Sequence, residues 1–537
     1  MTVTILCVKI VATMFIHRNS KRVGNKFYRS ILLMENYREG KKVLHRTLLN
    51  LSKWKPTDIE ALEAVLKGKK LSSLDQVETA EGKSVGALWV FKELAVECGL
   101  DKALGTGRNG RLSLLLVLGR LLTQGSRLHL CDWSKNQELE AVLGISRFNE
   151  DDLYGALDWL SARQQQIEKK LFDHCYKEEL PNLFLYDVTS SYFEGKNNEM
   201  AEFGYNRDRK GGKKQIVIGL MTDREGRPLA VEVFKGNTGD PKTFHSQVEK
   251  LSQRFGVKQV VMIGDRGMIK SSQIEALKEN DFFYITAITK PQIEVLLRNG
   301  VLQMGLFDTQ VMEIFADPVR YVLRRNPERG RDMAKNRQDK LQKVKTKARE
   351  LSAYLQAHPG AKQENAVNKV AALTNKLLIS EWVQVSAQDR IITISVDEGR
   401  LKEVSKLDGC YVIKTNVSKE QLSTEQVHRR YRDLTLVERA FRTIKTGYLE
   451  VRPIFLRKET RTRAHVFVTM LAFLLIHQFR KKTADLQITL ANMIDSLDKI
   501  QTVTLSLPGC IIKRIPEPLD HKAAILKALQ ITLPTSL

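Results

Sequence analysis

The pattern of apolar and polar positions divides the chain into six successive regions. In residues 1–55, β-favouring residues alternate from Lys26 to Leu51 on both sides of a turn at residues 38–41, which predicts a basic β-hairpin. Residues 56–178 change to the period of amphipathic helices, and the clearest examples are Asp58–Leu66, Val85–Cys98 and Arg111–Leu122. This helical region is a candidate for DNA binding, and a purely structural scaffold is an equally good interpretation.

Strand patterns begin after Pro181 and continue through residues 179–295. Short apolar or alternating runs predict strands at Leu183–Val188, Gln215–Met221, Leu229–Phe234 and Gln259–Ile263. Between these predicted strands the sequence has helical patterns, as at Thr243–Phe255. We therefore expect an α/β domain with mixed strand directions.

The next region, residues 296–425, has further strand-like pieces on both sides of a charged helical tract, Arg325–Leu378. Such a tract is usually a solvated helix face, although it would also suit a phosphate backbone. Residues 426–485 contain two helical patterns, Tyr431–Lys445 and the largely apolar Ala464–Lys481, which is suited to cover a sheet. Residues 486–537 are predicted to form a helical tail.

Within Tyr431–Lys445 two stripes of side chains are expected. Apolar residues recur at three- and four-residue steps, which places them on one buried face of a helix: Leu434, Val437, Phe441 and Ile444. A second stripe carries Tyr431, Glu438, Arg442 and Lys445. Taken alone, Glu438 and Arg442 are a common surface pair at four-residue spacing.

The amino-acid composition indicates that the protein binds a polyanionic partner. The 537 residues include 86 Lys and Arg against 62 Asp and Glu, a formal charge of +24, which is typical of nucleic-acid binding. A membrane is a weaker explanation, because no run approaches the ~20 apolar residues of a spanning helix. Six scattered cysteines without close Cys or His neighbours argue against a zinc site or a disulfide framework and fit a reducing cytosol.

Two aspartates follow the best-defined strand patterns, Asp187 after LFLY and Asp265 after VVMIG. Residues just past strand ends line the crevice where ligands bind in open α/β sheets, so these two acids are expected to face each other, with Glu438 completing the cluster. Three carboxylates suit Mg²⁺ or Mn²⁺, and two such ions support phosphoryl transfer. Each aspartate alone also fits a simpler role, Asp187 as a helix or turn cap and Asp265 as a turn residue.

Several long segments resemble the DDE transposases of bacterial insertion sequences, in the IS-four superfamily and nearest its IS-sixteen-thirty-four group. The resemblance covers nearly the whole chain. It rests on LFLYDVTSSYFEG, GYNRDRKGGKKQIVIGLMTDREGRPLAVEVFKGNTGDPKTF, VVMIGDRGM, YRDLTLVERAFRTIK, MFIHRNSKRVGNKFYRS and YREGKKVLHRTLLNLSKW.

This resemblance implies an α/β fold of the RNase H-like class, a mixed sheet with flanking helices, interrupted by a β-rich insertion domain and preceded by a helical DNA-binding region. It implies that Asp187, Asp265 and Glu438 are catalytic residues and ligands of two Mg²⁺ ions, which Mn²⁺ can replace. It also implies that residues 1–13 are an upstream extension.

The superfamily carries a Tyr-Arg-Glu-Lys signature around the glutamate. Tyr431, Glu438 and Lys445 match its spacing, and Tyr431 and Lys445 are expected to contact the DNA end, but Leu434 stands at the arginine position. The DNA-contacting cation is then to be sought among Arg432, Arg439 and Arg442, with Arg439 as first choice. Trp382 is expected either to stack on an extruded base or to be a core residue, the latter being commoner.

The expected function is cut-and-paste transposition by a bacterial, nucleoid-associated enzyme of the cytoplasm. Its partners would be double-stranded DNA, namely terminal inverted repeats and target DNA, and further copies of itself in a dimer or larger assembly, with no membrane. The alternatives are a metal-dependent nuclease of the same fold that does not join strands, and a non-catalytic DNA-binding protein derived from a transposase.

Overall fold

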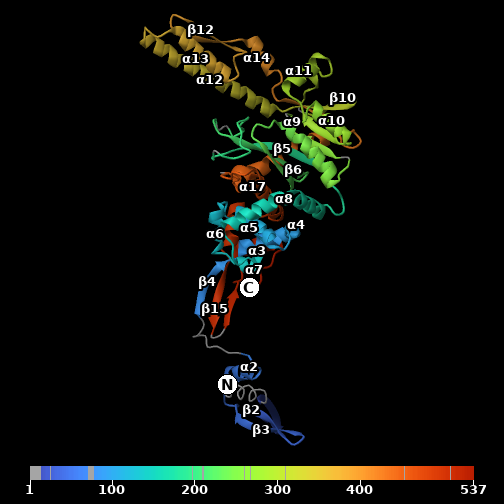
Figure 1. Ribbon diagram of the computed structural model, residues 1–537, viewed down its shortest axis with the longest axis vertical. Coiled ribbons are helices and arrows are strands. Elements are labelled where there is room, and N and C mark those ends of the chain that lie inside the picture. The colour runs from blue at the N-terminus through green and yellow to red at the C-terminus, as the bar shows by residue number, and fades with distance from the viewer. Residues whose placement is uncertain are drawn as a thin grey trace. The chain divides into compact units, whose positions relative to one another are not determined.

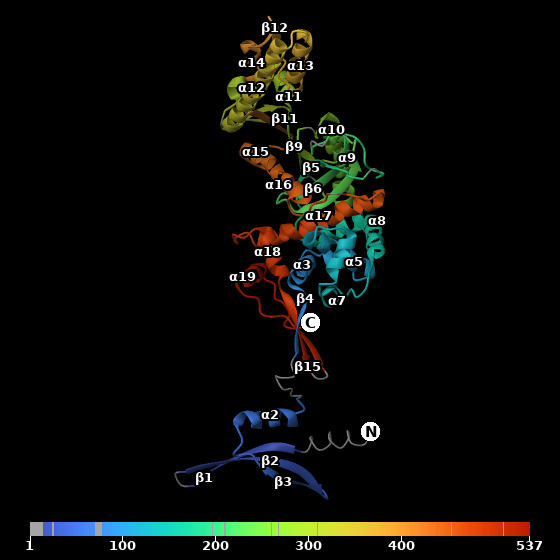
Figure 2. The ribbon, with the colours of Figure 1, turned by 90° about the vertical axis from the view of Figure 1, so that its left-hand side faces the viewer.

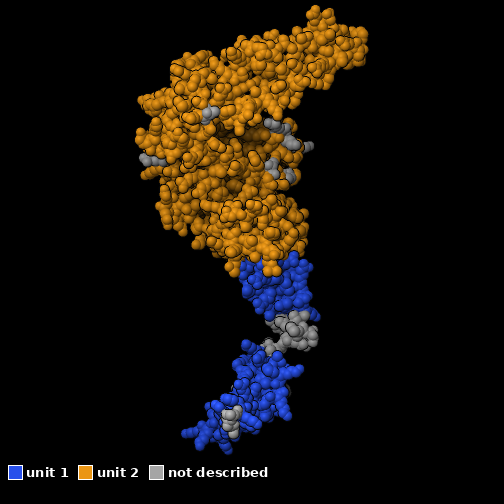
Figure 3. Space-filling view, turned by 180° about the vertical axis from the view of Figure 1, so that it is seen from behind, with its two compact units in different colours: residues 1–83, 500–518, 533–537 blue, residues 84–499, 519–532 orange. Residues whose placement is uncertain are grey.

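The computed structural model describes residues 14–23, 26–69, 78–195, 197–208, 211–258, 260–266, 268–308, 310–452, 454–507 and 510–537. The chain divides into two compact units, shown in blue and orange in Figure 3: residues 1–83, 500–518 and 533–537 form the first, and residues 84–499 and 519–532 the second. The predicted extension at residues 1–13 lies outside the described residues. The six-region division of the chain stays a prediction.

The first unit contains an antiparallel three-stranded sheet, ordered β1 (Met14–Val23), β2 (Lys26–Glu39), β3 (Lys42–Asn50), followed by helix α2 (Pro56–Leu66). The predicted hairpin is confirmed, and Gly40 turns it with a φ of +65°. Strand β1 was not predicted. Its run of polar residues after Ile16 weakens the apolar alternation by which strands are recognised.

A second small sheet joins distant parts of the chain, in the order β16 (Cys510–Arg514), β15 (Gln501–Leu507), β4 (Glu78–Ser84). A Cβ at Gly82 would lie 2.0 Å from Thr502 Oγ1, so this close approach requires glycine. The C-terminal region therefore contains two strands besides its predicted helices, α18 (Leu490–Asp498) and α19 (Asp520–Leu529). The prediction of a purely helical tail is wrong in this respect: β15 and β16 pair with each other, and β15 also joins β4, more than 400 residues earlier in the chain.

The second unit begins with a helical layer. Its helices are α3 (Gly86–Glu97), α4 (Leu100–Leu104), α5 (Arg108–Leu122), α6 (Arg127–Ser134), α7 (Leu139–Leu143) and α8 (Glu150–Cys175). The start of α8 is fixed by a capping box, in which Asn149 and Asp152 exchange side-chain and backbone hydrogen bonds. The three helices predicted between residues 58 and 122 are confirmed.

Helix α17 (Glu459–Lys482) lies between this layer and the central sheet, packed on α5, α8 and β7 (Figures 1 and 2). It is long and apolar enough to cross a membrane, but 83% of its most apolar window is buried inside the fold. Its apolar composition is thus explained by a core position, as the sequence predicted.

The central sheet is mixed and has eight strands in the order β10-β11-β14-β9-β8-β5-β6-β7. Their bounds are β5 (Leu183–Tyr192), β6 (Gln215–Asp223), β7 (Pro228–Lys235), β8 (Val261–Gly264), β9 (Phe283–Ala287), β10 (Met312–Ala316), β11 (Val319–Arg325) and β14 (Cys410–Thr415). Strands β5, β8 and β9 run parallel, and the other neighbours pair antiparallel. The predicted α/β architecture with a mixed sheet is confirmed.

Helical segments connect these strands: α9 (Asp240–Glu249), the π-helical turn η2 (Lys250–Phe255), α10 (Ser271–Glu279), α11 (Lys290–Arg298) and the short η3 (Met304–Leu306). The core beneath the sheet is built from fully buried aromatic and aliphatic side chains, among them Phe184, Tyr186, Phe244 and Met262. This packing holds β5 and β8 rigidly at the centre of the sheet.

Residues 326–408 form a lobe with its own core, made of α12 (Pro327–Ala357), α13 (Gln363–Lys376), β12 (Val383–Gln388), β13 (Ile391–Val396) and α14 (Glu398–Ser405). The lobe is more helical than the β-rich insertion expected over residues 296–425. Three of the strands in that range, β10, β11 and β14, belong instead to the central sheet. Strand patterns alone do not reveal which sheet a strand joins.

Candidate active site

The register of two parallel strands brings Asp187 and Asp265 side by side. Tyr186 of β5 is paired with Gly264 of β8, and the two aspartates are the next residues of these neighbouring strands. Adjacent strands lie ~4.8 Å apart, and paired positions face the same side of a sheet. Asp265 directly follows β8, as predicted. Asp187 lies inside β5, which continues to Tyr192 in its pairing with β6, so the prediction that it ends a strand is wrong.

Glu438 is presented by helix α16 (Leu434–Arg442), which packs against β5. The apolar stripe predicted for this segment is confirmed, because Leu434, Val437, Phe441 and Ile444 are all buried. Glu438 lies on the opposite, exposed side of α16. Burial of the stripe therefore fixes the direction in which the carboxylate points.

All three acids line one cavity of about 720 Å³, called here the acid cavity. Four basic residues share its wall: Arg266, Lys290, Arg329 and Arg432. A cavity lined by both carboxylates and cations suits the binding of a phosphodiester together with metal ions.

The acids affect one another electrostatically. Burial raises the pKa of the Asp187 carboxyl to about 7, against a hydrogen bond from the Val188 backbone, and the charges of Asp265 and Glu438 act in the same direction as burial. Like charges that share a site disfavour ionisation. Asp187 is therefore harder to ionise than an ordinary aspartate, and a bound cation would favour its ionised form.

The donor set fits a divalent cation in its chemistry. Carboxylate oxygens are the ligands that Mg²⁺ and Mn²⁺ prefer, and the three acids face one cavity from β5, β8 and α16. Across the described ranges, no three His, Cys, Asp or Glu side chains lie close enough together to hold one ion as they stand.

The segment Tyr431–Lys445 is three helical pieces, not one helix. Tyr431 lies near the end of α15 (Thr424–Arg432), Glu438 lies on α16, and Lys445 lies on the π-helical turn η4 (Thr443–Gly447). The Tyr431 hydroxyl donates a hydrogen bond to Asp265 Oδ1 at 3.3 Å. The signature tyrosine thus contacts the second acid directly.

Lys445 is not among the residues that line the acid cavity and belongs to a largely buried ionic network. Its ammonium donates to Thr189 Oγ1 at 3.0 Å, to the Ser190 carbonyl at 2.5 Å and to Asp208 Oδ1 at 2.7 Å. Arg452 binds the other oxygen of Asp208 at 3.1 Å. As the structure stands, Lys445 therefore ties the loop at Asp208 to strand β5, which sequence reasoning did not predict.

The predicted DNA-contacting cations are placed differently from one another. Arg439 lines a separate cavity of about 580 Å³ with Phe473 and Arg480, although it directly follows Glu438. Arg442 is exposed and lies outside the wall of the acid cavity as the described residues define it. Of the three arginines considered from the sequence, the structure brings Arg432 to the acids.

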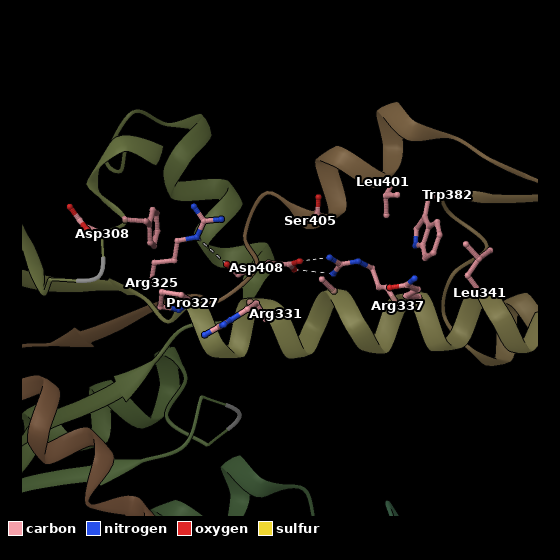
Figure 4. Close-up of a pocket in the computed structure, with 14 residues that line it drawn as sticks. Asp308, Arg325, Pro327, Arg331, Arg337, Leu341, Trp382, Leu401, Ser405 and Asp408 are labelled. Atoms are coloured by element: carbon pink, nitrogen blue, oxygen red, sulfur yellow. Dashed lines mark hydrogen bonds and ion pairs between the residues drawn. The ribbon is translucent and has the colours of Figure 1, made fainter.

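Trp382 lies in the core of the lobe, with 3% of its surface exposed. It lines a cavity of about 900 Å³ beside Leu341, and Figure 4 shows an Arg337–Asp408 ion pair next to them. The structure thus shows the buried position that the core interpretation predicts. Its role as a base-stacking residue stays a prediction.

Sequence reasoning missed three cations of the acid cavity: Arg266, Lys290 and Arg329. Arg266 directly follows the second aspartate, which is a usable signal. Lys290 and Arg329 belong to α11 and α12, and no spacing in the sequence links either to an acid.

Comparison with known proteins identifies the family of the chain. Residues 178–475, more than half of the chain, match the family described as "Transposase DDE domain", and residues 16–80 match "IS1634 family transposase, N-terminal domain". The first match contains all three acids. No curated protein sequence matches the chain.

A solved structure with partial similarity is the "Cryo-EM structure of piggyBac transposase synaptic complex with hairpin DNA", with 10% sequence identity over 77% of this chain and 75% of that chain and a TM-score of 0.37. Transposase DDE domains generally use divalent metal ions. With the DDE domain and the N-terminal domain both matched, the chain is a transposase that belongs to the DDE family and, within it, to the IS1634 group.

Proposed function

We propose that this transposase moves an insertion sequence by cut-and-paste transposition, with Asp187, Asp265 and Glu438 as its catalytic carboxylates. The observation that carries the proposal is that these acids reach one cavity from two adjacent parallel strands and a helix. Single capping or turn roles would not require the three to share a cavity.

The order of strands supports an RNase H-like core. Strands β5 to β9 follow the spatial order β7-β6-β5-β8-β9, with β5 antiparallel to β6 and parallel to β8. The first acid lies on the first of these strands and the second acid directly follows the fourth. This is the placement that the resemblance to DDE transposases implies.

Asp187, Asp265 and Glu438 would hold two Mg²⁺ ions, for which Mn²⁺ can substitute. When bound, such ions activate the attacking oxygen and stabilise the leaving oxygen of a phosphodiester. The chain's own contribution is to hold the acids in place: β5 and β8 fix the two aspartates, the Tyr431 hydroxyl orients Asp265, and α16 brings Glu438 to them.

The surrounding cations would position the DNA. Arg432, Arg266 and Arg329 line the wall above the acids, where they would bind phosphates on either side of the scissile bond. Water first attacks the phosphorus at each transposon end, and the bond to the 3′ oxygen breaks. The freed 3′-hydroxyl then attacks a target phosphodiester, displaces a second 3′ oxygen and loses its proton to solvent.

The partners would be terminal inverted repeats and target DNA, in keeping with the formal charge of +24. The N-terminal regions and the lobe at residues 326–408 would bind the repeats. Two ends must be held together for excision and joining, so the active species would be a dimer or a larger assembly.

The test is cleavage of a labelled transposon-end duplex in Mg²⁺, followed by joining of a pre-cut end to a plasmid. We expect Asp187→Asn, Asp265→Asn and Glu438→Gln each to lower cleavage by more than about 100-fold, since even indirect disturbance of metal ligands costs 10–100-fold. Asp281→Asn and Glu294→Gln are matched controls at exposed positions outside the acid cavity.

Each other outcome has a definite meaning. Cleavage at the parent rate by all three variants would show that the acids are assigned wrongly. Cleavage without joining would favour a nuclease of this fold, and binding without metal-dependent cleavage would favour a non-catalytic DNA-binding protein.

A further inference from the structure

Helix α12 starts at the acid cavity and carries positive charge away from it. Its N-cap Asn326, Arg329 and Met333 line the cavity wall. The helix then runs for 31 residues, the longest of the described elements, into the lobe. Its first turns are therefore part of the active-site wall, while its remainder lies beyond it (Figures 1 and 2).

The start of α12 is held in place by several contacts. Arg337 pairs with Asp408, and the Asn326 amide donates to the Gly409 carbonyl at 2.8 Å. Gly409 has a φ of +73°, and a Cβ there would lie 2.2 Å from the Asn326 carbonyl oxygen, so glycine is required. The direction in which α12 leaves the cavity is thus defined by the fold and not by a free hinge.

One face of α12 is buried in the lobe. Leu341, Val344, Ala348, Leu351 and Leu355 pack against α13 and the β12-β13 hairpin. Because a helix advances 100° per residue, the residues that share a side with Arg329 follow it at steps of three, four and seven. Besides Leu351, which is packed in the lobe, the residues that return to within about 40° of Arg329 are Met333, Asn336, Lys340, Lys343, Lys347 and Tyr354, called here the Arg329 stripe. Two acids, Asp332 and Glu350, lie about 60° from Arg329, at one border of the stripe.

The basic residues of the Arg329 stripe are at least partly exposed to solvent. Arg329, Lys343 and Lys347 are exposed and Lys340 is partly exposed. Lys347 pairs with Glu350 at 2.9 Å, whereas Lys340 and Lys343 have no ion pair among the residues that the structure describes. From Arg329 to Lys347 the helix rises about 27 Å, roughly the length of eight base pairs of B-form DNA.

We propose that the Arg329 stripe is the surface along which the DNA duplex leaves the acid cavity, with Lys340, Lys343 and Lys347 bound to its phosphates. The inference rests on the proposed function, because it takes the acids to act on DNA. It goes further in assigning the path of the duplex to one face of one helix. The exposed aromatic ring of Tyr354, 51% accessible, marks the far end of that path.

The opposite side of α12 provides a matched control. Lys335, Lys345 and Arg349 lie about 160–240° around the helix from Arg329, as follows from 100° per residue. They carry the same number of charges on the same helix, but no residue of this side lines the acid cavity. Long-range attraction of DNA by net charge would depend equally on the two sides, whereas direct phosphate contact would depend on the stripe alone.

The experiment compares three full-length variants for binding to a transposon-end duplex across a range of salt concentrations. The first is Lys340→Gln, Lys343→Gln and Lys347→Gln combined; the second is Lys335→Gln, Lys345→Gln and Arg349→Gln combined. The third combines Lys340→Arg, Lys343→Arg and Lys347→Arg, which keeps the charges of the stripe.

We expect the first variant to bind at least about tenfold more weakly than the parent, with a salt slope of log K smaller by about 2–3, because each lost phosphate contact removes ~0.9 from the slope. The control side and the arginine variant should bind within about twofold of the parent. Equal weakening of DNA binding in both glutamine variants, or parent-like binding by the first variant, would overturn the proposal that the stripe binds the duplex. Failure of the parent itself to bind and cleave the duplex would instead overturn the proposed function, so the two failures are distinguishable.

Discussion

Charged side chains meet strand β5 at two sites within four residues, and the two sites differ in how far their charges are paired. At Asp187 the charges of two further carboxylates, Asp265 and Glu438, disfavour the ionised form, while the charge of Arg207 acts against them. At Thr189 and Ser190 the strand receives Lys445, whose charge is matched by the buried Asp208. Binding of a cation would lower the free energy of the first site, whereas the charges of the second site are already paired with each other.

The two sites also distinguish a candidate catalytic residue from a residue with structural contacts within one sequence signature. Glu438 and Lys445 are seven residues apart in the same signature, yet one faces the acid cavity and the other faces the loop at Asp208. In this structure Lys445 binds Asp208 and strand β5, and its predicted contact with DNA stays a prediction. Variants at the two sites should accordingly change stability in opposite directions.

The largest expected effect on stability is at the ion-paired site around Asp208. Asp208→Asn would leave Lys445 and Arg452 as buried cations without a counter-charge, and we expect it to lower the free energy of unfolding by about 3 kcal/mol. Urea unfolding measures this. Asp158→Asn, which removes the more exposed partner of Arg461, should cost less than about 1 kcal/mol, and equal losses in the two variants would contradict the contrast.

Substitution of Asp187 should change the free energy of unfolding in the opposite direction. In EDTA, Asp187→Asn removes a negative charge that is crowded by two others, and we expect the free energy of unfolding to rise by about 1–2 kcal/mol. Mg²⁺ should raise the melting temperature of the parent and have less effect on the variant, because only binding to the folded state stabilises. A destabilised Asp187→Asn protein would show that this acid is structural.

A smaller effect is expected at the wall of the acid cavity. Arg432→Gln should weaken binding of a pre-cut transposon end by about tenfold, or 1.4 kcal/mol, since a cation beside the acids would bind the terminal phosphate. Arg439→Gln is the control, because Arg439 lines another cavity. A larger loss for Arg439→Gln would reverse the assignment.

The smallest effect is expected at the signature tyrosine. Tyr431→Phe removes one hydrogen bond to Asp265 and should lower the free energy of unfolding by only about 1 kcal/mol. Its cleavage rate should fall by about tenfold, as when the orienting partner of a ligand is lost. An unchanged cleavage rate would show that Asp265 does not depend on this contact.

Much of the local structure was predictable because its causes are local. The three- and four-residue steps of Leu434, Val437, Phe441 and Ile444 predicted the buried face of α16, and the apolar composition of residues 464–481 predicted a core helix. The sheet of β4, β15 and β16 was not predictable in this way. It depends on pairing between segments more than 400 residues apart, and no local pattern specifies such a partner.

The sequence by itself determined which residue types are available for chemistry: two aspartates at strand patterns and one glutamate on an amphipathic helix, in a strongly basic chain. Only the tertiary structure decided their neighbours. The pairing of Tyr186 with Gly264 brought the two aspartates level. The 100° step between Glu438 and Arg439 turned the adjacent arginine away, and the break after α15 left Arg432 at the cavity instead. The physical reason is that helical rotation and strand register are set by which side chains are buried, and burial is a property of the whole fold.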